Sequence, residues 1–314
     1  DYFCRTYWHI RHPSKGCIKF YMSPEQRATV DQWLDHRYTI ILKARQLGFS
    51  TLIGAFAVWA TYFYADRHII MLSKTERDAI KLLAKSKYGF KKLPDWMRLT
   101  GPIWDSKQTS LSFSNESVIE SLPSGNDPAR GESVWMLVLD EWAFLPNPEE
   151  AWASVEATTD IGGRVIGLST ANGEGNIFHD KWLSSSGEWT DQAGKTRKIG
   201  TGVGEFHSIF YGWWADGAGQ RDQEWHDNKA ANTADWQMAQ EYPSDPDEAF
   251  LRSGRPMFNV DALLEIECTE PDRGFLFRTA DGFIEYRLDG GSFAVWEEPR
   301  EQGVYVFGVD VAEG

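Results

Sequence analysis

The residues with the clearest chemical potential lie in a short loop at residues 43–51. A phosphate-binding loop between a strand and a helix needs inward backbone N–H groups, an ammonium for the phosphates and a hydroxyl for Mg²⁺. On the pattern G-x-x-x-x-G-K-[ST], two positions agree: Gly48 is the second glycine and Ser50 is the hydroxyl residue. Two positions depart from it: Phe49 occupies the position of the lysine, and Lys43 occupies the position of the first glycine. Such a loop brings its ends together around a triphosphate, so Lys43 is predicted to reach the β- and γ-phosphates of ATP.

Two further residues extend this loop. Arg45 is a second cation inside it, and Thr51 is a second hydroxyl directly after Ser50. Taken alone, the segment is more typical of a Gly-containing turn that begins a helix and leaves Lys43 in solvent. Its place between a predicted strand and a predicted helix puts the phosphate loop on an equal footing with that interpretation.

A pair of carboxylates, Asp140 and Glu141, follows the nearly continuous apolar run at residues 134–139. A buried strand with this ending puts both acids at the carboxyl edge of a parallel sheet, where ligands bind. We expect Asp140 to hold Mg²⁺ and Glu141 to orient or deprotonate an attacking water. Alone, the pair also fits an acidic turn at a strand end; the loop upstream favours the catalytic interpretation.

The elements that position these residues alternate between strands and helices. Strands are expected at the short apolar runs, and helices at the two longer segments that follow the first two strands. The strands are predicted at 38–42, 68–72, 110–113, 118–121, 134–139 and 165–169, and the helices at 51–65 and 75–87. Continuous apolar strands indicate a sheet covered on both faces, and the alternation indicates an α/β fold. The predicted fold class is a P-loop NTPase (ASCE/RecA-like), with a mostly parallel sheet flanked by helices and a smaller lid subdomain.

The chain changes character after Asn172. Residues 173–219 are rich in Gly, Ser, Asp and Trp, and residues 223–242 indicate one or two polar helices. We therefore expect four parts along the chain. They are an ATPase core at 1–175, a lid or second ATPase subdomain at 176–255, a connector with short strands at 256–303, and a buried strand that begins another domain at 304–314.

Composition excludes several classes of protein. Hydrophobic residues make up 42% and charged residues 25%, which is typical of a globular protein. The 3 cysteines show no C-x-x-C spacing, so a structural zinc site or a disulfide framework is not expected. The net charge of −14 excludes a small, globally basic DNA-binding module but leaves room for a local basic patch. The longest apolar run, residues 51–65, is too short to span a bilayer, so no membrane association is expected.

Several motifs in order resemble those of the large terminase subunits of tailed bacteriophages. They are the loop KARQLGFST, the strand with its acids WMLVLDEWAF, the segment GLSTANG, and, near the ends of the match, FYMSPEQ, PSDPDEAFLRSG and VYVFGVDVAEG. The resemblance covers the chain from about Phe20 onward. It implies that the loop and the acids are Walker A and Walker B motifs, and that the chain is an ATPase motor of viral genome packaging.

The resemblance also implies roles for single residues. Gln46 belongs to the nucleotide-binding loop, Gln26 reads the adenine edge, and Arg130 reaches as a finger into a neighbouring subunit's site. Arg45 is the alternative transition-state arginine. The element that couples hydrolysis to movement consists of Ser169, Thr170, Ala171 and Asn172. Asp310 would be the first metal ligand of an RNase H-like nuclease; since the other carboxylates of that site are absent, this chain is not expected to cut DNA itself.

The partners that the resemblance implies are double-stranded DNA, the portal protein of a procapsid and the small terminase subunit. A homo-oligomeric ring is expected when the motor is assembled, with a monomer as the alternative state of the isolated chain, and the host cell cytoplasm is the expected location. Two other functions stay open at this point: another nucleic-acid-dependent, helicase-like ATPase, and a non-catalytic assembly subunit whose nucleotide site is degenerate, as Phe49 would suggest.

Overall fold

The structure is a computed structural model that describes residues 1–102, 104–125, 133–159, 162–217, 219–253, 272–279, 281–282, 284–287 and 293–296. The chain divides into two compact units, Asp1–Met257 and Phe258–Gly314. No helix in these ranges combines the length and the apolar character that crossing a membrane requires.

A ten-stranded sheet forms the centre of the larger unit, in the order β11-β10-β12-β3-β9-β8-β4-β7-β6-β5. All pairings from β10 to β7 are parallel, and β11, β6 and β5 add antiparallel strands at the two edges. The strands are β3 (Tyr38–Lys43), β4 (His68–Ser73), β5 (Trp104–Ser106), β6 (Ser110–Phe113), β7 (Val118–Pro123), β8 (Met136–Asp140), β9 (Arg164–Ser169), β10 (Ser186–Thr190), β11 (Thr196–Ile199) and β12 (His207–Tyr211). The predicted mostly parallel α/β sheet is confirmed.

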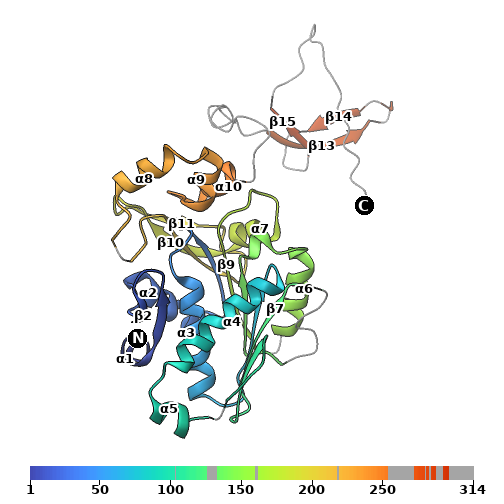
Figure 1. The fold of residues 1–314 in the computed structure, drawn as a ribbon. Coiled ribbons are helices and arrows are strands. Elements are labelled where there is room, and N and C mark those ends of the chain that lie inside the picture. Colours follow the sequence, from blue (N-terminus) through green and yellow to red (C-terminus); the bar gives the residue numbers. More distant parts are fainter. Residues whose placement is uncertain are drawn as a thin grey trace. The chain divides into compact units, whose positions relative to one another are not determined.

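Alternate residues of the central strands supply two separate cores, one on each face of the sheet. Ile41 packs with α3 (Phe49–Phe63) and α4 (Glu76–Lys91) on one face. Ile40 and Leu42 pack with α6 (Pro148–Thr159) and α7 (Ile177–Ser184) on the other. Figure 1 shows these helix pairs on opposite sides of the sheet. Because both faces are covered, the strands read as continuous apolar runs rather than alternating ones.

The remaining helices surround this core. They are α1 (Tyr2–Tyr7), α2 (Pro24–Asp35), α5 (Asp95–Thr100), the 3-10 turn η1 (Trp142–Phe144), α8 (Gln223–Ala230), α9 (Asp235–Glu241) and α10 (Pro246–Arg252). An exposed hairpin of β1 (His9–His12) and β2 (Gly16–Lys19) lies near the N-terminus. The sequence predicts the helix after the loop at 51–65, whereas α3 spans Phe49–Phe63. The helix begins two residues earlier than predicted because its N-cap residue, Gly48, adopts the left-handed conformation.

The sheet continues past residue 175. Strand β12 pairs with β3, the strand that leads into the loop, and β10 pairs with β12. The residues before and after 175 therefore share one sheet and one compact unit. Helices α8, α9 and α10 follow these strands, and the division of this unit into core and lid stays a prediction. The predicted connector lies largely, and the segment 304–314 entirely, outside the described residues.

The described part of the smaller unit is a three-stranded antiparallel sheet in the order β14-β13-β15. Its strands are β13 (Asp272–Arg278), β14 (Ile284–Arg287) and β15 (Phe293–Val295). The short strands that the sequence predicted in this region are present.

Candidate nucleotide-binding site

The loop after β3 holds Lys43 in a buried position. Lys43 is the last residue of that strand, and it is 6% exposed. Gln46 and Gly48 both have positive φ, 63° and 80°, so the backbone turns sharply before α3 begins. Ser50 and Thr51 lie half-buried in the first turn of that helix, beside the backbone N–H groups that a helix leaves unpaired at its start.

Phe49, at the position where the usual pattern has lysine, points into the core. It is 2% exposed, and its ring stacks on Tyr211 with the centroids 5.3 Å apart. Tyr211 lies on β12, so this contact ties the start of α3 to the strand beside β3. The ammonium of a lysine at position 49 would have to leave this apolar contact to reach a phosphate.

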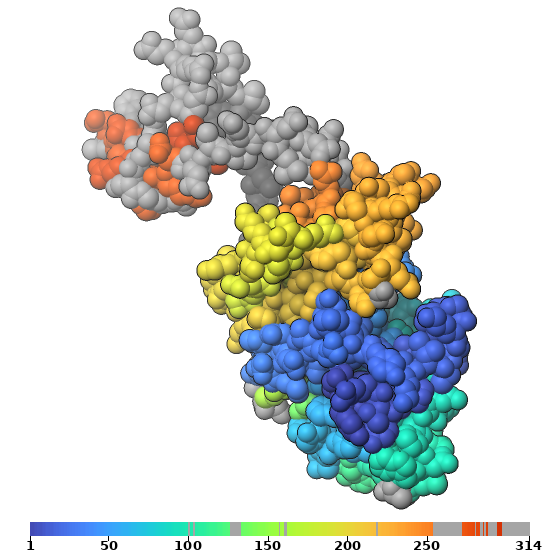
Figure 2. Space-filling model, turned by 90° about the vertical axis from the view of Figure 1, so that its left-hand side faces the viewer, coloured from blue at the N-terminus to red at the C-terminus, as the bar shows by residue number. Residues whose placement is uncertain are grey.

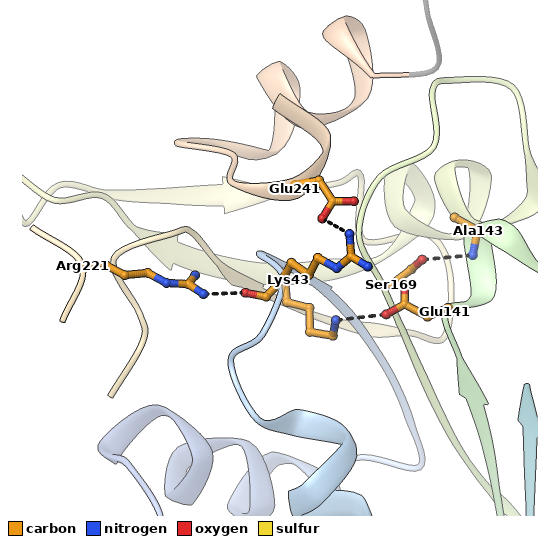
Figure 3. A network of polar contacts seen from close by, with 7 residues as sticks. Lys43, Glu141, Ala143, Ser169, Arg221 and Glu241 are labelled. Atoms are coloured by element: carbon orange, nitrogen blue, oxygen red, sulfur yellow. Dashed lines mark hydrogen bonds and ion pairs between the residues drawn. The ribbon is translucent and has the colours of Figure 1, made fainter. Parts of the chain in front are cut away.

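The two predicted acids face the loop across the carboxyl edge of the sheet. Strand β9 separates β3 from β8, and both strands end at this edge. Lys43 Nζ lies 3.5 Å from Glu141 Oε1 (Figure 3). Glu141 has φ of 54°, a conformation that costs free energy in a non-glycine residue and is found at functional sites.

Asp140 is the electrostatically perturbed group of the site. Burial, followed by the charge of Glu141, raises the pKa of Asp140 from 3.8 to about 6, while the charges of Lys43 and Lys85 act in the opposite direction. Asp140 Oδ1 is buried without a hydrogen-bond partner in the described part of the chain. A buried carboxylate oxygen without a partner is suited to a cation, because a cation supplies the interaction that the protein does not.

A cavity of about 310 Å³ opens at this edge of the sheet. Its walls come from the ends of β4, β8 and β9, from the loop after β3, and from η1, α4 and α9. Its lining residues are Arg45, Ser73, Lys74, Asp78, Asp140, Glu141, Phe144, Thr170, Gln240 and Glu241. Ser73 Oγ is buried there and has no hydrogen-bond partner among the described residues. The sequence did not single out Gln240 or Glu241, because nothing in the local pattern brings residues of α9 to this edge.

Arg45 is bound to α9. Its Nη1 lies 2.6 Å from Glu241 Oε2, and its backbone N–H donates to the carbonyl of Glu241 at 2.8 Å. The bond to Glu241 raises the pKa of Arg45. Arg221 donates from Nη2 to the carbonyl of Arg45 at 2.9 Å, as Figure 3 shows. The region after residue 176 therefore holds the loop from two sides, through residues that the sequence did not indicate.

Gln26 braces the same loop from α2. Its Nε2 donates to the carbonyl of Leu47 at 3.0 Å, and its Oε1 accepts from the backbone N–H of Ser23 at 3.1 Å. A Cβ at Gly48 would lie 2.8 Å from Gln26 Nε2. Each end of the Gln26 amide makes one bond within the chain. The amide keeps a second N–H and a second lone pair, which is what contact with a base edge would use.

The segment Ser169–Asn172 is connected to the turn that follows Glu141. Ser169 Oγ accepts from the backbone N–H of Ala143 at 3.2 Å, and Asn172 Nδ2 donates to the carbonyl of Ala143 at 2.9 Å. Thr170 lines the cavity, and Ala171 is fully buried. Two hydrogen bonds therefore connect this segment to the turn that follows Glu141.

Two predicted residues, Arg130 and Asp310, lie outside the described residues. Within the ranges that the structure describes, no three or more His, Cys, Asp and Glu side chains gather as a metal site would require. One or two protein ligands together with a substrate's phosphates are the usual arrangement for Mg²⁺.

Comparison with known proteins agrees with this geometry. The family model for the N-terminal part of T4likevirus-type large terminase subunits matches residues 40–196, which is 157 of 314 residues and half of the chain. The ATPase domain of the Thermus phage P74-26 large terminase is similar in structure, with 17% identity and a TM-score of 0.59. That match covers 72% of this chain and 94% of that domain.

Two longer terminases are also similar. The HK97 bacteriophage large terminase shares 12% identity at a TM-score of 0.58, over 91% of this chain and 65% of that one. The large terminase of a thermophilic bacteriophage, solved in complex with ADP, shares 11% identity at a TM-score of 0.53, over 71% of this chain and 53% of that one. The structural matches support the fold, and the match to the family model shows which family the chain belongs to. The chain belongs to the large terminase subunits, the DNA-packaging motors of tailed phages, and corresponds to their N-terminal ATPase domain.

Proposed function

We propose that this chain hydrolyses ATP at the carboxyl edge of the sheet, where Lys43 meets the acids Asp140 and Glu141, and that hydrolysis drives double-stranded DNA into a procapsid. The observation that carries the proposal is the 3.5 Å approach of Lys43 Nζ to Glu141 Oε1, from strand ends on either side of β9. A buried ammonium and a carboxylate that face each other across a phosphate-type loop give one group for the γ-phosphate and one for the attacking water.

The loop would hold the phosphates. Lys43 supplies the charge, and the backbone N–H groups from Gln46 through Ser50 supply donors at the start of α3. The Phe49 side chain takes no direct part; it fixes the beginning of the helix by its contact in the core, and Phe49 contributes its backbone N–H to the loop. The lysine at the leading end of the loop therefore replaces the one that the usual pattern has at its trailing end.

Asp140 and Ser50 would hold Mg²⁺. The partnerless, buried Oδ1 of Asp140 fits a cation, and Ser50 lies at the start of the neighbouring helix. When bound, Mg²⁺ neutralises charge that develops on the β- and γ-phosphate oxygens. Its binding favours the ionised form of Asp140, whose pKa burial otherwise raises.

Glu141 would orient the attacking water and accept its proton. The side chain is 42% exposed, so a water has access to its carboxylate, and the backbone at this position has a positive φ of the kind found at functional sites. Glu141 pairs with Lys43; a bound γ-phosphate would compete for that ammonium and free the carboxylate for the water.

Arg45 and Arg130 are the two candidates for charge stabilisation in the transition state. Arg45 lines the cavity and would exchange Glu241 for a phosphate oxygen. Arg130 would act in the site of a neighbouring subunit of a homo-oligomeric ring. Gln26 is proposed to contact adenine through the N–H and the lone pair that its two present bonds leave free.

The segment Ser169–Asn172 would couple hydrolysis to movement through its bonds to Ala143. The proposed partners besides DNA are a portal protein and a small terminase subunit, in the cytoplasm of the host cell. Asp310 would be a metal ligand of the nuclease domain of a longer protein.

Phosphate release with Glu141→Gln tests the function. Loss of a positioned base typically costs 10²–10⁴ in rate, so hydrolysis should fall by roughly that factor while ATP still binds. Glu188→Gln, which removes the same charge from an exposed position on β10, is the matched control and should hydrolyse normally. Wild-type turnover in Glu141→Gln would refute the assignment of the base. No phosphate release by the wild-type chain, with or without DNA, would favour a non-catalytic assembly subunit.

A further inference from the structure

Two segments of this acidic chain contain no acidic residue at all. Residues 2–24 hold four Lys or Arg and residues 79–94 hold five, and neither contains Asp or Glu. The two segments carry +9 between them, and since the net charge of the chain is −14, the rest of the chain carries −23. A charge separation of this size indicates where the surface attracts anions, and it carries no information about the fold.

The fold brings these two segments together. The β1–β2 hairpin and α4 are in contact, and a cavity of about 520 Å³ opens between them. We call it the basic groove; its lining residues are Ile10, Arg11, Thr51, Lys81, Ala84, Lys85, Lys87, Tyr88 and Lys91. In Figure 2 the dark-blue N-terminal segment lies beside blue-green residues of the α4–α5 region. Five of the nine lining side chains are cationic, from elements far apart in the sequence.

Few acids balance these cations. Among the described residues, Lys81 pairs with Asp78 at 3.3 Å, and the other four make no ion pair with a carboxylate. Arg11 lies over the Tyr88 ring at 4.9 Å, and Lys87 donates to the carbonyl of Gln108 at 3.1 Å. Burial lowers the pKa of Lys85, and the charge of Asp140 in the nucleotide site opposes this shift. Burial, followed by the charge of Lys91, lowers the pKa of Lys87. Like charges held this close together are relieved by an external anion.

The groove adjoins the nucleotide site along α4. Thr51, which follows the proposed Mg²⁺ ligand Ser50, lines the groove. Asp78 lines the nucleotide cavity, and its ion-pair partner Lys81, one turn further along the helix, lines the groove. One helix therefore forms a wall of both sites, and an anion that competes for Lys81 also acts on a residue of the nucleotide cavity.

We propose that the basic groove binds the phosphodiester backbone of the duplex DNA that the motor moves; the identity of this anion rests on the proposed function. Lysine and arginine side chains bind phosphates without reading sequence, and a motor that passes along DNA needs contacts of this kind. Because α4 is shared, DNA in the groove should also raise the rate of ATP hydrolysis.

The test compares two double variants with the same change in charge. Arg11→Gln/Lys91→Gln removes two groove cations, whereas Lys195→Gln/Lys198→Gln removes two exposed cations in and beside β11. The probe is a mixed-sequence DNA duplex, whose binding is measured by fluorescence anisotropy at several salt concentrations. The slope of log K against log salt should fall by about 1.8, or 0.9 for each lost contact, and affinity at 0.1 M salt should fall roughly ten- to a hundredfold. The control should match the wild-type chain.

ATP hydrolysis without DNA separates this proposal from the proposed function. The groove variant should keep the DNA-free rate and lose the stimulation by DNA. Equal DNA affinity and salt slope in the groove variant, the control and the wild type would overturn the groove while leaving the ATPase assignment intact. If the groove variant lost binding to poly-glutamate but not to DNA, the partner would be an acidic polypeptide and the proposal would again be wrong. Lys91→Gln alone repeats the test without removing the Arg11–Tyr88 contact and should change the salt slope by about 0.9.

Discussion

Replacement of Asp140 by Asn should stabilise the chain in the absence of metal and nucleotide. The substitution keeps the shape of the side chain and removes a charge that burial makes unfavourable. The ammonium groups of Lys43 and Lys85 favour the ionised carboxylate but do not outweigh burial, since the pKa stays above its ordinary value. A residue proposed to be essential for activity is therefore expected to be costly for stability.

The size of the effect follows from the pKa. A rise from 3.8 to about 6 corresponds to about 3 kcal/mol, at about 1.36 kcal/mol per pKa unit. Because the folded pKa is the higher one, the folded state binds more protons between pH 4 and 6, and stability falls as pH rises through this window. Asp140→Asn should thus be more stable than the wild-type chain by up to about 3 kcal/mol at pH 7.5, and the difference should vanish near pH 4.

Chemical denaturation in EDTA at pH 4.5, 6 and 7.5 measures this difference. Asp78→Asn is the control, because Asp78 lines the same cavity but its pKa is shifted in the opposite direction. A hydrogen bond from the Thr75 side chain is the main cause that lowers the pKa of Asp78. That variant should lose stability at pH 7.5. Added Mg²⁺ with a non-hydrolysable ATP analogue at 100 times its Kd should stabilise the wild-type chain by about 2.7 kcal/mol and Asp140→Asn by much less.

The reasoning would be refuted if Asp140→Asn were no more stable than the wild-type chain at pH 7.5 without metal. That result would mean that solvent or a neighbouring group already satisfies the carboxylate. Equal stabilisation of both chains by the Mg²⁺–nucleotide complex would separately remove Asp140 from the metal site.

Three further outcomes are expected. Phe49→Lys should lose roughly 3–5 kcal/mol in denaturation, because it removes a core aromatic and buries a charge; wild-type stability would mean that position 49 can turn toward the nucleotide. Gly48→Ala should weaken ATP binding in equilibrium titration and cost about 1–2 kcal/mol, because φ is 80° and the new Cβ would meet the Gln26 amide; unchanged affinity would contradict this role of the loop geometry. Arg130→Ala protein should regain phosphate release when mixed with Glu141→Gln protein, and no recovery at any ratio would argue against an arginine that acts between subunits.

Much of the fold was predictable because its signals are local. The strands around residues 40, 70, 137 and 167 are short apolar runs bounded by polar residues, and in a sheet covered on both faces such runs are strands wherever they occur. The parallel arrangement then places Lys43 and the acids after residue 139 at one edge. The contact between Lys43 and Glu141 agrees with that prediction.

The contacts that complete the site were not predictable, because they join distant residues whose local patterns are ordinary. Glu241 and Arg221 follow the loop by about 170 residues or more and hold it only because β12 pairs beside β3 and brings the later helices to this edge. The alternation of apolar strands and helices in the sequence determined the α/β fold and which side chains reach the catalytic edge. The tertiary structure decided which residues hold those side chains there. It also gathered the cations of the N-terminal hairpin and α4 into one groove, which could not be predicted because local sequence patterns do not show which distant charges packing brings together.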